Sequence, residues 1–182
     1  KYKYVLKIPK KFKKYYSAKV IVEYSNEKKC IFEAEGRIHG GRGDHVSNKN
    51  LLTSLRIRIK NGNINGINNF TLFLPESRNG DSEIFTTLLL QKLNILSPFT
   101  MNVKVGINDR ETGKFIFQEK IDKNFLFKNK KTEGLILAAN KSYQIEDSGI
   151  QFNDSFDRLS FIANDYVDKK FDFENAVNNL NY

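Results

Sequence analysis

The sequence predicts an α+β fold, a mostly antiparallel β-sheet with one embedded helix followed by a short helical tail. Three observations lead to this fold class. Apolar and polar residues alternate along most of the first 120 positions, one segment near position 85 has helical periodicity, and helical spacings return beyond position 150. The chain has 182 residues, 40% of them hydrophobic, which is enough apolar mass for a sizeable core.

The strands are predicted from a period of two, which is typical of half-buried strands. The clearest example is Leu55–Lys60, with apolar side chains on one face and cationic side chains on the other. A glycine-rich stretch at 40–44 precedes it, and Asn-Gly dipeptides at 61–62 and 65–66 predict turns after it. Strands are predicted, in chain order, over residues 2–6, 20–24, 31–38, 55–60, 70–74, 101–107 and 114–118.

The embedded helix is predicted over Glu83–Leu93, because Ile84, Leu88 and Leu89 share one helical face. Asp81 is the predicted N-cap of this helix, since a short acidic side chain favours that position. The polar segment 108–113 predicts a hairpin between the last two strands.

The C-terminal part of the chain has a different pattern. Apolar residues at three- and four-residue spacings predict a helix there. They are Phe156, Leu159, Ile162, Ala163 and Tyr166. Residues 1–140 are therefore predicted to form a β-rich part and residues 141–182 a helical part.

Composition and charge narrow the function classes. Residues 1–60 carry 16 Lys and Arg against 5 Asp and Glu, and a basic face attracts phosphate-bearing partners. No RNA-recognition, basic-zipper or zinc-finger pattern favours a nucleic-acid partner. One cysteine, Cys30, rules out an internal disulfide, and two histidines do not predict a structural zinc site. No apolar run approaches the ~18–20 residues needed to cross a bilayer, so we expect a soluble protein without a membrane span.

Six short segments follow one another in a characteristic order. They are Arg42–Ser47, Ser54–Lys60, Asn69–Asp81, the helix beginning at Glu83, Ser97–Thr100 and Gly113–Asp122. Their order and spacing resemble the CotH proteins, the spore-coat-protein-H family of atypical protein kinases, over residues 31–140. The chain is similar to a divergent member of this family, and to its N-terminal half only.

The resemblance implies a protein-kinase-like N-lobe over 1–140 and the start of a second lobe, or a C-terminal extension, over 141–182. It also implies binding of ATP with Mg²⁺ or Mn²⁺. The residues implied to hold the nucleotide are Gly40, Gly41, Arg42, Gly43, Arg56, Arg58, Lys60, Glu83 and Glu119.

The implied roles follow those of a kinase N-lobe. The glycines of 40–43 would let backbone N–H groups approach phosphates, and a cation of the strand at 55–60 would pair with Glu83. The alternation places the three cations of that strand on one face and does not rank them. Glu119 would border the adenine pocket. The same residues also have purely structural readings: a flexible hairpin, a solvated strand face, a first-turn acid favoured by the helix dipole, and a surface ion pair.

The chain also departs from the family pattern. Asp44-His45 follows Arg-Gly where many relatives have Asn-Ser, and Ser82 stands where the family often has Arg. The family's catalytic aspartates lie further along its sequence, and no aspartate of this chain is assigned a catalytic role.

Two functions are therefore predicted. The first is phosphate transfer from ATP to a protein partner, which in the family is often a coat or surface protein. The alternative is a non-catalytic structural or assembly module of a coat, capsid or appendage, built on the same fold.

Overall fold

The structure is a computed structural model. It describes residues 10–40, 52–108, 110–132, 137–139, 143–146, 149–152 and 159–161. The chain divides into two compact units, Lys1–Phe125 and Leu126–Tyr182. This division falls earlier than the predicted boundary between residues 140 and 141. The short helix α2 (Lys123–Lys128) contains the point of division.

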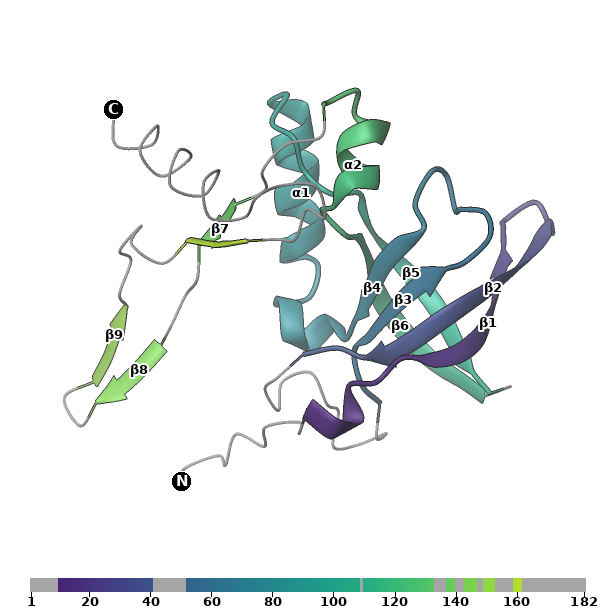
Figure 1. The fold of residues 1–182 in the computed structure, drawn as a ribbon, viewed down its shortest axis with the longest axis horizontal. Helices are drawn as coiled ribbons and strands as arrows, with labels where there is room; N and C mark the ends of the chain where they lie inside the picture. The colour runs from purple at the N-terminus through teal and green to yellow at the C-terminus, as the bar shows by residue number, and fades with distance from the viewer. Residues whose placement is uncertain are drawn as a thin grey trace. The chain divides into compact units, whose positions relative to one another are not determined.

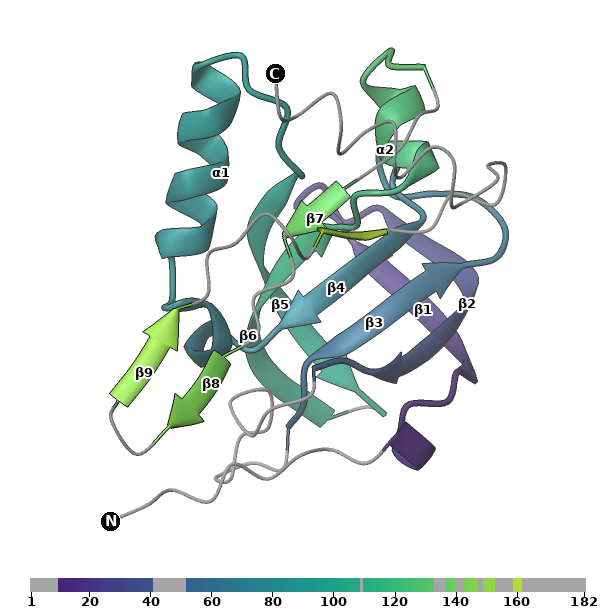
Figure 2. The same cartoon turned by 60° about the vertical axis from the view of Figure 1, so that its left-hand side comes forward.

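The first unit contains a six-stranded sheet in the order β1-β2-β3-β4-β6-β5. Every neighbouring pair is antiparallel, and Figures 1 and 2 show the sheet strongly curled with α1 beside its β5–β6 side. Its elements are η1 (Lys10–Phe12), β1 (Tyr16–Glu23), β2 (Lys29–Ile38), β3 (Leu55–Ile59), β4 (Asn69–Phe73), η3 (Pro75–Arg78), α1 (Ser82–Lys92), β5 (Thr100–Ile107) and β6 (Arg110–Glu119). The α+β class with a mostly antiparallel sheet is confirmed.

One face of the sheet carries a hydrophobic core cluster. The rings of Phe70 on β4 and Phe117 on β6 stack with centroids 4.5 Å apart, and each residue is at most 6% exposed. Because successive side chains of a strand point to opposite faces, the apolar positions of β3 enter this core and its arginines lie on the other face. We call these the core face and the arginine face. The core cluster consists of Ala34, Ile57, Ile59, Ile67, Phe70 and Phe117.

The predicted turn at 65–66 is confirmed. Asn65 and Gly66 both have positive φ angles, 51° and 81°, as a type I′ turn requires. Ile64 and Ile67 each donate a backbone hydrogen bond to the other's carbonyl at 2.9 Å. The side chain of Asn63 accepts a further hydrogen bond from the N–H of Gly66 at 2.7 Å.

Replacement of Gly62 by alanine is expected to destabilise the fold by about 1–2 kcal/mol or more. Gly62 has a φ of 95°, and an added Cβ would lie 3.1 Å from Cε1 of Phe32. Gly80→Ala is the matched control, because Gly80 also has a positive φ, 63°, but nothing within 4 Å of an added Cβ. Urea unfolding of both variants separates backbone strain from the clash, and an equal loss in the two would contradict a role for the Phe32 ring.

The embedded helix is also confirmed. α1 begins one residue before the predicted start and ends one residue before the predicted end. Asp81 stands at the predicted N-cap position, but its side chain forms no capping hydrogen bond. Its backbone is in the αR region, with φ −77° and ψ −3°, whereas a capping side chain needs an extended backbone. The carboxylate Oδ1 instead accepts a hydrogen bond from Nδ2 of Asn102 on β5 at 2.8 Å.

In the second unit the structure describes strands. β7 (Leu137–Ala139) pairs with β10 (Leu159–Phe161), and β8 (Tyr143–Glu146) pairs with β9 (Gly149–Phe152). The helix predicted across 156–166 is therefore wrong at 159–161. Leu159-Ser160-Phe161 also fits a period of two, and the partner strand that decides between the two periods lies about twenty residues earlier. The rest of the predicted helical tail lies outside the described residues, as does the strand predicted over 2–6.

None of the helices that the structure describes is long and apolar enough to cross a membrane.

Candidate anion-binding face

A row of polar side chains crosses five strands on the arginine face. Residues that are directly opposite each other in an antiparallel sheet point to the same side, so the register defines the row. Arg56 donates from Nε to Oγ1 of Thr71 at 3.4 Å, and Gln118 donates from Nε2 to Oγ1 of Thr100 at 3.5 Å. The polar row consists of Arg37 (β2), Arg56 (β3), Thr71 (β4), Gln118 (β6) and Thr100 (β5).

Three arginines gather at the β2–β3 end of this row. Arg37 is directly opposite Arg56, and Arg58 follows two positions along β3 on the same face. The ring of Tyr15 covers two of them, with its centroid 4.3 Å from Cζ of Arg58 and 5.2 Å from Cζ of Arg37. We call Arg37, Arg56 and Arg58 the arginine cluster. In the described part of the chain, no salt bridge joins any of the three to a carboxylate.

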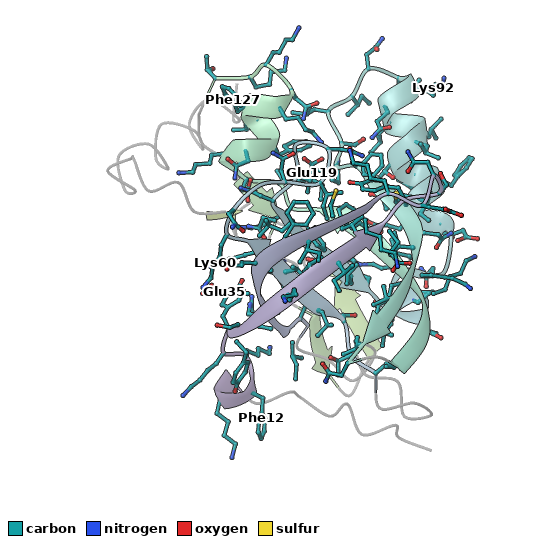
Figure 3. All side chains as sticks on the ribbon, turned by 90° about the vertical axis from the view of Figure 1, so that its right-hand side faces the viewer. Phe12, Glu35, Lys60, Lys92, Glu119 and Phe127 are labelled. Atoms are coloured by element: carbon teal, nitrogen blue, oxygen red, sulfur yellow. The ribbon has the colours of Figure 1, made fainter. Side chains whose placement is uncertain are left out.

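Lys60, the third predicted cation, is different from the arginines. Its Nζ lies 3.1 Å from Oε1 of Glu35, and Figure 3 shows these two side chains close together at the side of the sheet. Glu35 is directly opposite Arg58 in the register, but its ion pair is with Lys60. The structure therefore distinguishes the cations that the sequence left equal: Lys60 forms an ion pair with a carboxylate, whereas Arg56 and Arg58 form none with the described residues.

The pKa of Arg56 reflects both its burial and the concentration of positive charge in the cluster. Burial lowers the pKa of Arg56 below its usual value, and the positive charge of Arg37 lowers it further. Arg58 adds to this effect, whereas Tyr15 and Asp122 oppose it. Nε of Arg37 and the hydroxyl oxygen of Tyr15 are both buried without a hydrogen-bond partner. Buried donors are normally satisfied, so these unpaired groups, together with the three cations, make this face a candidate site for an anion.

Glu83, on the first turn of α1, lies over the other end of the polar row. Its Oε1 accepts a hydrogen bond from Nε2 of Gln118 at 2.6 Å, and its Oε2 lies 3.9 Å from Nη1 of Arg78. Glu83 and the arginines are thus on the same face, but the partners of Glu83 are Gln118 and Arg78 and not a cation of β3. Thr71, between Arg56 and Gln118, occupies the intervening strand.

Arg78 forms a second aromatic contact on this face. Its Cζ lies 3.8 Å above the ring of Phe73, and His39 meets the same ring edge-on at 5.3 Å. Gly40 follows His39 with a φ of 95°, a conformation that glycine adopts at little cost. The predicted loop residues Gly41, Arg42 and Gly43 lie outside the described residues.

Glu119 lies on the opposite face from the arginine cluster. It is directly across from Phe70, it is 5% exposed, and its Oε2 accepts a hydrogen bond from the backbone N–H of Phe99 at 3.1 Å. Figure 3 labels it in the interior of the side-chain packing. The structure therefore does not bring Glu119 together with the other predicted site residues.

The sequence alone did not indicate Arg37 and Tyr15 as site residues. Arg37 ends an alternating run in which Glu33 and Glu35 share its face, and this pattern alone could have placed it on the polar side of the strand. Its position opposite Arg56 depends on a register set across the long connection between β2 and β3. Tyr15 follows a lysine-rich run and has no sequence signal of its own.

No group of three or more His, Cys, Asp or Glu side chains with the geometry of a metal site occurs among the described residues. A comparison of the chain with protein-family models gives no match, and a comparison with curated proteins gives none either, so membership of the CotH family remains a prediction.

Proposed function

We propose that this chain is the nucleotide-binding part of a CotH-like atypical protein kinase and that the arginine cluster binds the phosphates of ATP. The observation that carries the proposal is the group of three arginines that form no salt bridge with a described carboxylate, on the same face of the sheet as the helical carboxylate Glu83. In this proposal the acceptor is a protein, such as a coat or surface protein.

The arginine side chains of this face are chemically suited to bind phosphate. A guanidinium group presents a planar fork of donors that matches two phosphate oxygens and stays protonated at any physiological pH. In a protein kinase a strand cation and a helical carboxylate contact each other directly. Here Thr71 and Gln118 lie between Arg56 and Glu83, so the polar row would link the two ends. A bound Mg²⁺ or Mn²⁺ would neutralise charge on the phosphates.

The proposal predicts that ATP stabilises the chain against heat. At 100 times its Kd, a ligand that binds only the folded state adds about 2.7 kcal/mol, which is readily visible as a rise in Tm. Adenosine, which lacks phosphates, should give a much smaller rise. The measurement is thermal unfolding with MgATP, MnATP or adenosine at millimolar concentration.

The matched variants remove the same number of positive charges from two places. Arg56→Gln/Arg58→Gln should lose the ATP-dependent rise, whereas Lys92→Gln/Lys114→Gln, which changes two exposed lysines outside the cluster, should keep it. The absence of any rise with the unaltered chain, or an equal loss in both double variants, would count against a nucleotide site.

A second candidate function is an assembly module, and one observation favours it. Large apolar side chains are exposed along α1 and the loop that follows it, and such patches often mark protein interfaces. They are Phe85, Leu88, Leu89, Leu93, Ile95 and Leu96, each 43–67% exposed. The assembly function would be preferred if neither MgATP nor MnATP raised the Tm of the unaltered chain.

A further inference from the structure

We infer that the arginine face binds an oligophosphate chain directly, without a metal ion, and that Arg37 and Tyr15 belong to this site. The inference rests on the phosphate site of the proposed function and deepens it, because it concerns the same face and gives the metal ion of the nucleotide complex no part in holding the phosphates to the arginines. It adds two residues that the sequence did not indicate.

The site concentrates positive charge. Arginine stays protonated in proteins, so the cluster places three positive charges at neighbouring positions on one face of β2 and β3. Burial lowers the pKa of Arg56, and the positive charges of Arg37 and Arg58 lower it further, as expected for like charges in a partly desolvated place. An oligophosphate carries several negative charges along one chain, so it could neutralise more than one of the three guanidinium groups at once.

The arginine cluster also offers many hydrogen-bond donors. Each guanidinium group has five N–H donors, and the only hydrogen bond that the three groups make among the described residues is from Nε of Arg56, at a long 3.4 Å. Nε of Arg37 is buried and has no partner. These donors can replace the coordination that a metal ion otherwise gives to phosphate oxygens.

Tyr15 is the remaining residue of the site. Tyr16 pairs with Gly36, so the next position along the register places Tyr15 beside Arg37. Its ring centroid lies 4.3 Å from Cζ of Arg58 and 5.2 Å from Cζ of Arg37, so cation–π contacts with one ring hold both arginines. Its hydroxyl oxygen is buried without a hydrogen-bond partner. We assign Tyr15 the role of positioning the arginines and donating its hydroxyl to a phosphate oxygen.

A metal ion bound to the phosphates would compete with the arginines, because it reduces the negative charge that they attract and occupies the same oxygens. Affinity should therefore rise in the order orthophosphate, pyrophosphate, tripolyphosphate. For a given ligand, affinity in EDTA should be equal to or higher than affinity with excess Mg²⁺.

The experiment is calorimetric titration of the full chain with tripolyphosphate, pyrophosphate and orthophosphate in EDTA, and with ATP in EDTA or in Mg²⁺, at fixed ionic strength. Arg37→Gln should weaken tripolyphosphate binding about tenfold or more, as expected for a lost charged hydrogen bond. Tyr15→Phe, which keeps the ring and removes the hydroxyl, should weaken it about threefold to tenfold. Lys114→Gln, which removes an exposed charge from β6, should change it by less than about twofold.

The outcomes separate this inference from the proposed function. If tripolyphosphate binds in an Arg37-dependent way and ATP does not bind, the inference stands and the nucleotide function fails. If ATP binds only with Mg²⁺ and Arg37→Gln has no effect, the function stands and the inference is overturned. Equal weakening by Arg37→Gln and Lys114→Gln would also overturn it, because general attraction would then suffice. Arg37→Lys keeps the charge and removes the planar fork, so it provides the same test, with a smaller loss, if Arg37→Gln does not fold.

Discussion

Phe117→Ala is expected to lower the free energy of unfolding of the first unit by about 3–5 kcal/mol, enough to unfold many domains of this size. Phe117 is 6% exposed, stacks on Phe70 at 4.5 Å and meets the ring of Phe99 edge-on at 6.2 Å. Alanine would remove buried apolar surface, leave a cavity between β4 and β6, and break both ring contacts.

Urea unfolding followed by circular dichroism measures this loss. Phe85→Ala is the matched control, since Phe85 on α1 is 67% exposed and its removal should change the free energy of unfolding by no more than about 0.5 kcal/mol. A loss below about 1 kcal/mol for Phe117→Ala would show that the stacked pair is not part of the cooperative core.

Gln118→Glu is expected to destabilise the first unit by about 1–3 kcal/mol near neutral pH. Nε2 of Gln118 donates to Oε1 of Glu83 at 2.6 Å, and the substitution would replace this donor with a second carboxylate. Arg78, at 3.9 Å from Glu83, can offset part of the repulsion but not supply the lost hydrogen bond. Two close carboxylates raise the pKa of one of them above its unfolded value. The destabilisation should therefore grow as the pH rises through that raised pKa and fade below about pH 4.

A double-mutant cycle tests the specificity of this contact. In Glu83→Gln/Gln118→Glu the donor and the acceptor exchange places, so the pair can again form a hydrogen bond and stability should largely return. Chemical unfolding at pH 7 and pH 4 provides the four free energies. If the double variant were as unstable as Gln118→Glu alone, the 2.6 Å contact would not be the cause.

Much of the sheet could be predicted from the sequence because its signals are local. The alternation in Leu55–Lys60 predicted both the strand and the face that its arginines occupy, since a period of two needs no knowledge of partners. The Asn65-Gly66 turn was predictable because few other dipeptides accept two successive positive φ angles. The helix at α1 followed from the spacing of its apolar residues, although several of these, including Leu88 and Leu89, are about half-exposed.

The parts that could not be predicted depend on contacts between distant segments. The pairing of Arg37 with Arg56 requires the register between β2 and β3, and no short-range pattern specifies it across the connection between them. The same holds for Lys60 and Glu35, whose ion pair separates Lys60 from the arginine cluster. At 159–161 the local spacing fitted both a helix and a strand, and pairing with β7 decided for the strand.

The pairing of β4 with β6 joins two parts of the sheet that are far apart in the sequence. The strands β1 to β4 follow one another in sequence, and β5 and β6 form a hairpin, so within each of these two pieces every strand pairs with its neighbour in sequence. They join where Phe70–Phe73 pair with Ile116–Glu119, after η3, α1 and β5 have intervened. Closing so long a loop costs chain entropy before any contact is gained, so this joining step should be the slow one in folding. The polar row crosses this junction between Thr71 and Gln118, and it becomes continuous only when the two pieces have met.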